Sequence, residues 1–314
     1  MNTSETISCP LCNSDKTILW SVAKDYEYAS TNEEYDYYYC KNCISIFISP
    51  VPEIDLHKIY PTNYYSFQQD KKNWAFSIKE WLDKKLVKQI LKQTKNDSIN
   101  VLDIGGGTGW LCDLVKTIDK RIALTQIVDI DNSAKKNAKE KGHQYFEGRI
   151  EEFTSSEKFE LVFLLNLLEH VARPIEVLQQ IDQLLNPGGI VLIKTPNILS
   201  LDARLFRKKY WGGLHCPRHW IIFSENSFRK MLTTTDLRIT NLHYTQGGPF
   251  WAFSIIVWLS KKGFVKTGKE RPVIFHPLFP FISSLFAAFD FIRRPFAKTS
   301  QMFIILKKNE LRES

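Results

Sequence analysis

The segment from residue 103 to residue 109 combines an acid with alternating glycines, in the pattern Asp103-x-Gly105-x-Gly107-x-Gly109. Glycines let a ligand approach the backbone, and a tight strand-to-helix turn presents N–H groups to that ligand. A dinucleotide fingerprint would place its third glycine where this chain has Trp110, and a phosphate-binding P-loop would need a lysine that is missing. The spacing therefore excludes the two commonest nucleotide loops and leaves a different ligand for this turn.

The elements around the glycines have the hydrophobic patterns of a strand, a helix and a second strand. An apolar run, Ile99 to Ile104, predicts a buried strand, and residues 111–118 have helical spacing. A second strand, 122–128, ends at Asp129, about twenty residues after the last glycine. An acid at that place can accept hydrogen bonds from both ribose hydroxyls of a nucleoside. Asp131 with Asn132 is better suited to capping the next helix.

Strands and helices continue to alternate after residue 132, which predicts a mostly parallel sheet covered by helices. The expected helices are 132–141, 174–185, which begins at a proline, and 225–234, which Ser224 caps. The expected strands are 144–147, 159–165, 190–194, about 237–244, and 301–308.

Three ordered motifs resemble class I S-adenosylmethionine (SAM) methyltransferases: the glycine turn, the segment Asn166 to Val171 (NLLEHV), and the segment 184–197 (LLNPGGIVLIKTPN). The resemblance spans residues 99–197. It implies an α/β fold with a Rossmann-like seven-stranded sheet, helices on both faces, and SAM as cofactor. It also implies that the last strand, 301–308, inserts antiparallel between the fifth and sixth strands.

The same resemblance implies which residues contact SAM. Ile150 would recognise adenine through its backbone, although Arg149 stands where relatives commonly carry an acid. The residues that the resemblance assigns to the cofactor are Asp103, Gly105, Gly107, Gly109, Asp129, Ile130, Ile150 and Asn166.

Four of the six cysteines form two C-x-x-C pairs, Cys9 with Cys12 and Cys40 with Cys43. Two such pairs supply a tetrahedral shell of four thiolates, which is typical of a zinc ribbon. Because no ligand position is left open, we expect a structural Zn²⁺ rather than a catalytic one. A redox pair is the alternative, and a second C-x-x-C argues against it.

Past residue 197 the chain supplies groups for a methyl acceptor. The loop from Trp211 to Trp220 holds two histidines, His215 and His219, of which we favour His219 as general base because family members carry a similar Pro-Arg-His. A hydrogen-bonded structural role is an equally simple interpretation of either histidine. His170 belongs to the cofactor motif, where packing explains it. The aromatic turn 60–65 is either packing or a lid.

The net charge of +8 is concentrated in the last third, where residues 201–314 hold 19 Lys/Arg against 7 Asp/Glu. Between the sixth and seventh strands lies an insertion, 249–299, with two aromatic and aliphatic runs edged by lysine and arginine. It suits a helical hairpin at a membrane surface. A cap on the core or a dimer contact is the alternative. The runs are too short or too interrupted to span a bilayer.

We therefore expect four parts: a zinc ribbon (1–50), a linker with a helix (51–98), a methyltransferase domain (99–248 and 300–310), and the apolar, basic insertion (249–299). This combination resembles bacterial methyltransferases of cell-surface glycan and lipid pathways, with ubiquinone-type O-methyltransferases as more distant relatives. The resemblance implies methylation of a hydroxyl on a sugar or lipid-linked intermediate.

Two other functions stay open at this point: an RNA methyltransferase that uses the zinc module, and a SAM-fold protein without catalysis. Nucleic acid is not expected, because the basic residues accompany bulky apolar runs rather than isolated stacking aromatics.

The polar start, Met1 to Ser8, lacks the apolar stretch of a signal peptide. We expect a cytoplasmic protein, peripheral to the inner membrane face; the sequence does not indicate its oligomeric state.

Overall fold

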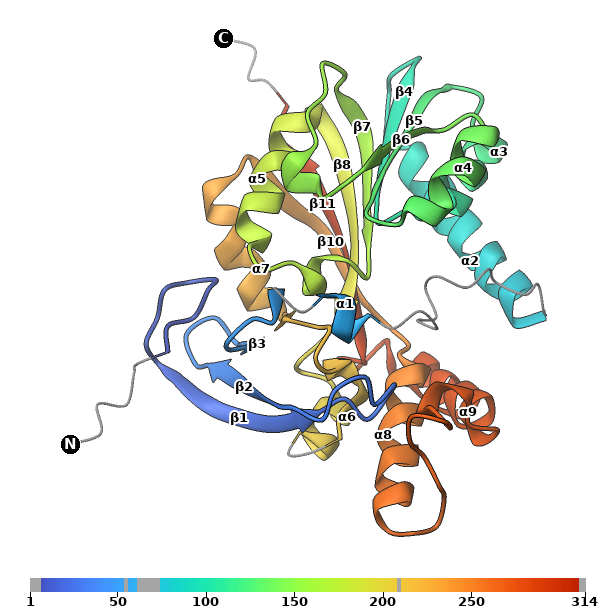
Figure 1. The fold of residues 1–314 in the computed structure, drawn as a ribbon. Helices are drawn as coiled ribbons and strands as arrows, with labels where there is room; N and C mark the ends of the chain where they lie inside the picture. The colour runs from blue at the N-terminus through green and yellow to red at the C-terminus, as the bar shows by residue number, and fades with distance from the viewer. Residues whose placement is uncertain (1–6, 54–55, 61–73, 208–209, 311–314) are drawn as a thin grey trace.

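The computed structural model describes residues 7–53, 56–60, 74–207 and 210–310 (Figure 1). Its centre is a seven-stranded sheet whose neighbours pair parallel, except that the last strand runs antiparallel to both of its neighbours. This confirms the expected Rossmann-like sheet and the antiparallel insertion of its last strand. In spatial order the strands are β10 (Leu237–Thr245), β11 (Gln301–Lys308), β8 (Leu185–Pro196), β7 (Phe159–Leu165), β4 (Ile99–Ile104), β5 (Ile122–Asp129) and β6 (Gln144–Glu147).

The central strands are apolar on both sides because helices cover both faces of the sheet. In β7, six of seven residues are buried. Asp103 pairs in register with Ile127 of β5 and Phe163 of β7, so the carboxyl ends of these three parallel strands meet at one edge. The segments that follow the strands, including the glycine turn, therefore gather at this edge.

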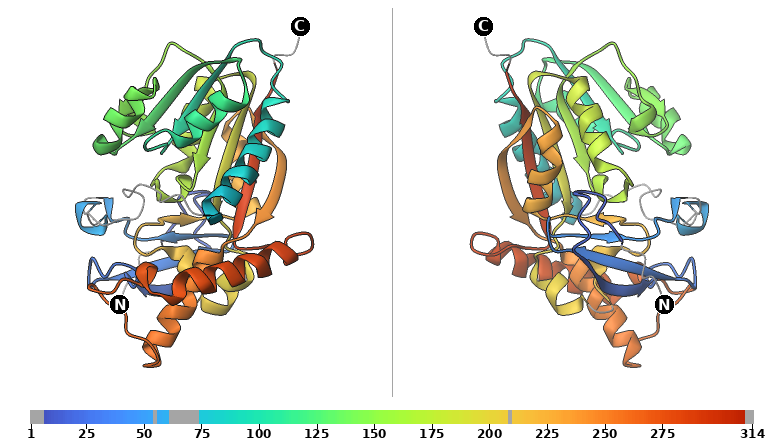
Figure 2. Two further views of the ribbon diagram at one scale, coloured as in Figure 1. Left: turned by 90° about the vertical axis from the view of Figure 1, so that its right-hand side faces the viewer. Right: turned by 90° about the vertical axis from the view of Figure 1, so that its left-hand side faces the viewer.

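Two layers of helices enclose the sheet, and Figure 2 shows them from two sides. One hydrophobic cluster joins α2 (Trp74–Leu91) and α3 (Trp110–Ile118) to the sheet, and α4 (Asn132–Glu140) packs beside α3. The opposite face is covered by α5 (Pro174–Leu184) and α7 (Glu225–Met231). The expected helix 225–234 ends earlier and continues as a 3-10 turn, 232–234. Asp131 and Ser224 cap α4 and α7 as predicted.

The two cysteine pairs belong to a second, four-stranded antiparallel sheet of order β1-β2-β3-β9. Its first three strands are β1 (Thr17–Lys24), β2 (Glu34–Cys40) and β3 (Ser45–Ile48). The fourth, β9 (Ile221–Ile222), comes from the predicted acceptor loop far downstream. The N-terminal module therefore shares a sheet with the acceptor side. The short helices α1 (Leu56–Ile59) and α6 (Leu201–Phe206) lie near this four-stranded sheet (Figure 1).

The insertion between β10 and β11 is a helical hairpin of α8 (Gly248–Lys261) and α9 (Leu278–Arg293). Figures 1 and 2 show the hairpin and the four-stranded sheet at the same end of the large sheet. Half of α8 is buried, whereas Asp290 is the buried residue of α9. Among the described helices, none combines the length and the apolar content that crossing a bilayer needs.

Candidate functional site

A pocket of about 400 Å³ lies at the sheet edge where the carboxyl ends of β4, β5 and β7 meet. Open α/β sheets bind their ligands at such an edge, and the volume is in the range of small-molecule sites. Most of its wall comes from the strand ends and from the loops 148–152 and 166–173. Glu53 and Tyr60, from before the methyltransferase domain, and Trp220, from the loop 211–220, complete the wall.

The glycine turn forms one wall because its backbone adopts conformations that other residues avoid. Gly105, Gly107 and Gly109 have φ values of +76°, +50° and +80°. A Cβ on Gly109 would lie 2.6 Å from the His143 ring, so this position also lacks space for a side chain. Glycine is therefore required by both dihedral angle and packing, and α3 can start directly after the turn.

Asp129 ends β5 and faces the pocket. Its Oδ2 accepts a hydrogen bond from the Gly107 N–H at 2.8 Å, and its Oδ1 accepts one from the Asp131 N–H at 2.9 Å. Burial raises its pKa, while these N–H donors partly oppose that shift. Asp103 lies deeper, 4 % exposed, and its pKa is raised to about 7 by burial and then by the charge of Asp129.

Five of the eight residues that the sequence assigned to the cofactor line this pocket: Gly105, Asp129, Ile130, Ile150 and Asn166. Three do not. Gly107 reaches the pocket only through its hydrogen bond to Asp129, and Gly109 packs on His143.

Asp103 is not part of the pocket wall and lies against the turn, where a Cβ on Gly106 would be 2.5 Å from its carboxylate. Ile130 is 60 % exposed, which leaves an apolar surface at the rim of the pocket. Arg149, which replaces the acid common in relatives, also lines the wall.

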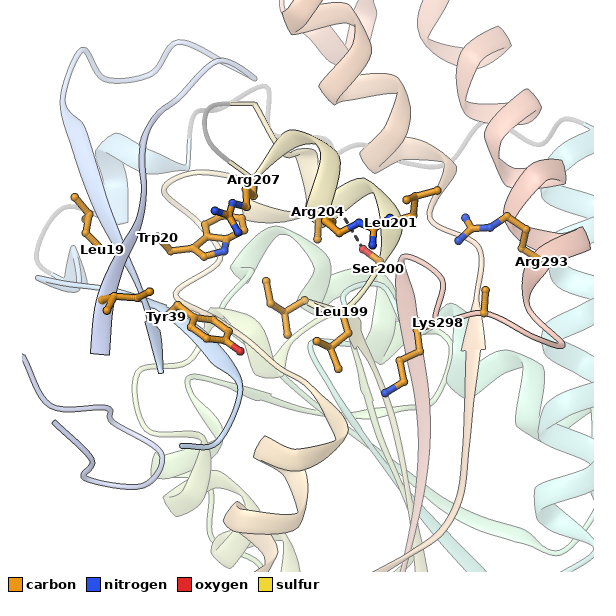
Figure 3. Close-up of a pocket in the computed structure, with 14 residues that line it drawn as sticks. Leu19, Trp20, Tyr39, Leu199, Ser200, Leu201, Arg204, Arg207, Arg293 and Lys298 are labelled. Atoms are coloured by element: carbon orange, nitrogen blue, oxygen red, sulfur yellow. Dashed lines mark hydrogen bonds between the residues drawn. The ribbon is translucent and has the colours of Figure 1, made fainter. Parts of the chain in front are cut away.

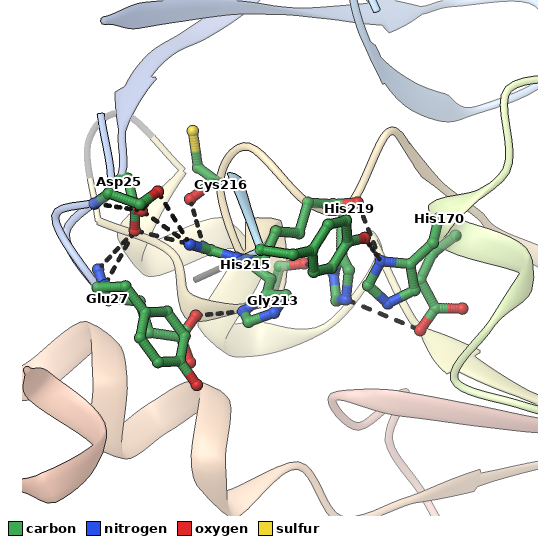
Figure 4. Close-up of polar contacts among 12 residues, drawn as sticks. Asp25, Glu27, His170, Gly213, His215, Cys216 and His219 are labelled. Atoms are coloured by element: carbon green, nitrogen blue, oxygen red, sulfur yellow. Dashed lines mark hydrogen bonds and ion pairs between the residues drawn. The ribbon is translucent and has the colours of Figure 1, made fainter. Parts of the chain in front are cut away.

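The imidazole in the pocket wall is His170, and neither His219 nor His215 lines the pocket. The sequence placed both histidines on the acceptor side, and the structure places them outside the wall of this pocket. They form a second row: the His219 ring lies 4.6 Å from the His170 ring, centroid to centroid, and is 5 % exposed. His215 pairs through Nδ1 with Glu27 of the N-terminal module (Figure 4). The motif Asn166 to Val171 contains His170 and is a signal from which the place of this histidine in the pocket wall could have been predicted. Packing was the simpler interpretation of the same residue.

Hydrogen bonds define the tautomers of His170 and His219, whose rings meet edge to face. Nδ1 of His219 lies 2.8 Å from the Gly213 carbonyl, and Nδ1 of His170 lies 3.0 Å from the Arg218 carbonyl and 3.1 Å from the Tyr60 hydroxyl. Because a carbonyl oxygen only accepts, each Nδ1 carries the proton and each Nε2 keeps its lone pair. Residues 61–65, the rest of the predicted aromatic turn, lie outside the described residues.

Burial keeps these imidazoles neutral. It lowers the pKa of His170 to about 3 and that of His219 well below the ordinary value, and the neighbouring histidines add to both effects. The adjacent Glu169 is fully buried, and burial raises its pKa to about 8. One ligand atom from each of these three residues lies within 4.8 Å of the others. The site therefore offers uncharged nitrogen and carboxyl groups near neutral pH.

The N-terminal module holds the histidine loop in place. Arg218 is fully buried and forms a two-pronged ion pair with Asp25, with nitrogen-to-oxygen distances of 2.8 and 3.3 Å. Burial opposes ionisation of Asp25, but the Arg218 charge and hydrogen bonds outweigh it and lower the pKa. The Tyr37 hydroxyl donates to the His219 carbonyl at 3.1 Å. The module thus positions the backbone on either side of His219.

The four paired cysteines converge with the geometry of a metal site. The Sγ atoms of Cys9 and Cys43, and those of Cys12 and Cys40, are 3.6 Å apart, and all four lie within 4.8 Å. Ligands about 2.3 Å from a tetrahedral Zn²⁺ are about 3.8 Å from each other. Hydrogen bonding to Cys43 lowers the pKa of Cys9 to about 5, while the pKa of Cys43 is raised. The donor set fits a cation that lets all four thiols ionise.

The family model of the methyltransferase domain matches residues 76–242, more than half of the chain. A ubiquinone biosynthesis O-methyltransferase of Bradyrhizobium sp. (strain ORS 278) is 33 % identical over 147 residues, which cover 44 % of this chain and 54 % of that protein. The mitochondrial ubiquinone biosynthesis O-methyltransferase of Dictyostelium discoideum is 28 % identical over 169 residues, 46 % of this chain and 52 % of that protein. The chain spans about half the length of these relatives.

A solved structure with a similar fold is that of a coclaurine N-methyltransferase bound to N-methylheliamine and SAH. The TM-score is 0.50 at 16 % identity, over 77 % of this chain and 76 % of the other. At this identity the likeness concerns the fold of the sheet and its helices.

Proposed function

Because the chain belongs to the class I SAM-dependent methyltransferase family, we propose that it transfers the methyl group of SAM to a hydroxyl of a small-molecule acceptor. The observation that carries the proposal is the pocket at the carboxyl edge of β4, β5 and β7, where the glycine turn meets a carboxylate. The similarity to ubiquinone biosynthesis O-methyltransferases supports oxygen as the acceptor atom.

The residues present fit SAM at three points. Asp129 would accept hydrogen bonds from the ribose hydroxyls, and the turn at Gly105 would present its backbone to the amino-acid part. Ile130 and Ile150 would flank the adenine. SAM, when bound, supplies an activated methyl group on a sulfonium. The protein then has mainly to hold donor and acceptor in line.

We propose His170, rather than His219, as the residue that orients the acceptor. His170 lines the pocket, and its neutral Nε2 can accept a hydrogen bond from a hydroxyl group. A pKa of about 3 makes it a weak base and leaves Nε2 unprotonated at neutral pH, so that this nitrogen is available to accept a hydrogen bond. His219 packs behind it and limits its movement.

Replacing His170 by alanine is expected to lower kcat by about two orders of magnitude, because a misplaced acceptor loses the in-line geometry. His219→Gln is expected to cost less than about tenfold, since its effect is indirect. SAM affinity, measured by calorimetry, should stay near the wild-type value in both variants. A larger loss for His219 than for His170 would restore the assignment from the sequence.

The pH profile is a second readout of the same assignment. A neutral His170 with its pKa near 3 should leave kcat flat between about pH 5.5 and 7 at saturating SAM. A base with an ordinary imidazole pKa would instead lose activity as the pH falls through about 6.5. Such an inflection, absent in His219→Gln, would identify His219 as a general base.

We propose that the four-cysteine site holds a structural Zn²⁺. Cys9, Cys12, Cys40 and Cys43 would complete the coordination shell, so the metal would take part in no step of methyl transfer. Its contribution would be to fold the module that carries Asp25, Glu27 and Tyr37, the residues that hold the histidine loop.

We further propose that the acceptor is a sugar or lipid-linked intermediate that the protein binds at a membrane surface. We propose α9 as the element that contacts the membrane. Five apolar residues recur at helical spacing along α9 and are exposed, among them Phe281 at 68 %, and Phe296, three residues after the helix, is 78 % exposed. Lysines and arginines border the hairpin, including Lys262, Lys266 and Arg294. Exposed apolar side chains beside basic ones match an anionic bilayer surface.

Changing Phe281, Leu285 and Ile292 together to serine is expected to weaken binding to vesicles with one third phosphatidylglycerol by at least about tenfold. These side chains are 56 to 68 % exposed, so folding should be retained. Co-sedimentation measures the effect, with the exposed Val22→Ser as a control. Unchanged vesicle binding, with loss of a wild-type dimer in light scattering, would make the stripe a dimer contact instead.

Calorimetry with SAM, with ATP and NAD as controls, tests the proposed function directly. We expect SAM binding at one site per chain and none with the two controls. Absence of SAM binding would favour a binding protein without catalysis. Tight, salt-sensitive binding of RNA, with methyl transfer to it, would favour the RNA methyltransferase.

A further inference from the structure

A second pocket, of about 620 Å³, lies between the N-terminal module and the end of the hairpin (Figure 3). Its walls come from β1, from Tyr39, from the segment 198–207 that follows β8, and from the last turn of α9 with the residues after it. It shares no lining residue with the cofactor pocket, so any ligand here occupies a separate site.

The charge of this pocket is one-sided. Its lining includes Arg204, Arg207, Arg293 and Lys298 and no acidic side chain. Arg293 is paired with Asp290 at 3.1 Å. Within the described part of the chain, the other three side chains are exposed and have no ion-pair partner. Cations without counter-charges around a concavity create a positive potential that attracts anions.

The rest of the lining is mostly apolar, and part of it is unusually exposed. Ile18 is 46 %, Leu19 54 % and Leu199 39 % exposed, and Figure 3 shows Leu199 between Tyr39 and Lys298, and Leu19 next to Trp20 on the side away from the basic side chains. Trp20 packs edge to face on Trp211, which leaves the aliphatic side chains as the accessible apolar surface. A purely ionic ligand would leave this surface in water.

We propose that this pocket binds a phosphate-bearing amphiphile, with the phosphate against the arginines and the apolar chain over the aliphatic wall. Guanidinium groups match phosphate oxygens with two parallel hydrogen bonds, and Lys298 adds a third cation. The apolar chain of the ligand contacts the aliphatic wall formed by Ile18, Leu19 and Leu199. The proposal stands apart from methyl transfer, because the cofactor pocket takes no part in it.

Calorimetry with dihexanoyl phosphatidic acid, below its micelle concentration, tests the site. The variant R204Q/R207Q/K298Q should bind it at least about tenfold more weakly than wild type. The control K84Q/K88Q/K92Q removes the same charge from exposed lysines on and after α2 and should bind like wild type. Both variants should keep wild-type SAM affinity, which checks the fold and separates this test from the proposed function.

Other outcomes overturn the proposal. Equal binding by wild type and the triple variant, or no binding by wild type, would remove the site. Equal affinity for inorganic pyrophosphate would reduce it to a simple anion site, and equal affinity for dihexanoyl phosphatidylcholine would remove the role of the charge. Vesicles with phosphatidic acid separate the sources when the α9 stripe is first removed by F281S/L285S/I292S: further loss of co-sedimentation on adding R204Q/R207Q/K298Q identifies a membrane lipid, and no further loss identifies a freely dissolved amphiphile.

Discussion

Asp129→Ala is expected to weaken SAM binding by about two orders of magnitude or more. The carboxylate would accept two hydrogen bonds from the ribose, and charge-assisted bonds contribute roughly 1.5–3 kcal/mol each. The substitution also removes the bond from the Gly107 N–H, 2.8 Å away, which steadies the glycine turn. Calorimetry with SAM measures the loss, and kcat/KM should fall in parallel.

The pH dependence of SAM affinity follows from the same carboxylate. Burial raises the pKa of Asp129, and only its ionised form accepts bonds from both hydroxyls. SAM affinity should therefore fall as the pH falls toward that pKa, and this fall should vanish in Asp129→Ala. Asp131→Asn is the matched control, because asparagine also caps α4 and position 131 lies outside the pocket wall. Wild-type SAM affinity in Asp129→Ala would refute the cofactor assignment.

Cys43→Ser is expected to abolish stoichiometric zinc and to destabilise the protein by on the order of 4 kcal/mol or more. Cys43 links the N-terminal module to α7: its carbonyl accepts a hydrogen bond at 3.3 Å from Ser224, the N-cap of α7, and β3 pairs with β9 just beyond it. Loss of the metal should therefore loosen the histidine loop. Turnover should fall strongly, whereas SAM affinity should change little.

Elemental analysis gives the zinc content, and thermal unfolding gives the stability. Cys112→Ala is the control, because Cys112 is equally buried but lies on α3, away from the four-cysteine site. A strong chelator on wild type should reproduce the Cys43→Ser behaviour. Zinc-free wild-type protein, or full zinc content in Cys43→Ser, would contradict the metal site.

Five of the residues that the sequence assigned to SAM line the pocket, and their meeting at one place could be predicted because its determinants are local. The turn at Gly105 needs positive φ, and Asp129 ends the neighbouring strand, so a short pattern encodes both. Parallel strands bring their carboxyl ends to one edge whatever else the chain does. The positions of Ile130, Ile150 and Asn166 in the wall follow from the same rule.

The arrangement of the loop 211–220 could not be predicted from the sequence, because it depends on contacts between distant segments. The Pro-Arg-His pattern of the loop favoured His219 as the base. In the structure Arg218 forms an ion pair with Asp25, and Nδ1 of His219 donates a hydrogen bond to the Gly213 carbonyl. His170 then becomes the imidazole at the pocket. No spacing within the loop carries this information, since Asp25 lies in another sheet.

By itself the sequence determined the family sheet, the cysteine quartet, the glycine turn and the hairpin insertion, because hydrophobic period, turn chemistry and ligand spacing are local properties. Only the tertiary structure decided that β9 completes the N-terminal sheet, that His170 stands in front of His219, and that three exposed cations gather beside Leu199. Those arrangements arise from pairing and ion pairs between segments far apart in the chain. The free energy of these contacts depends on the packed fold, and the residues that form them show no local sequence pattern from which the contacts could be predicted.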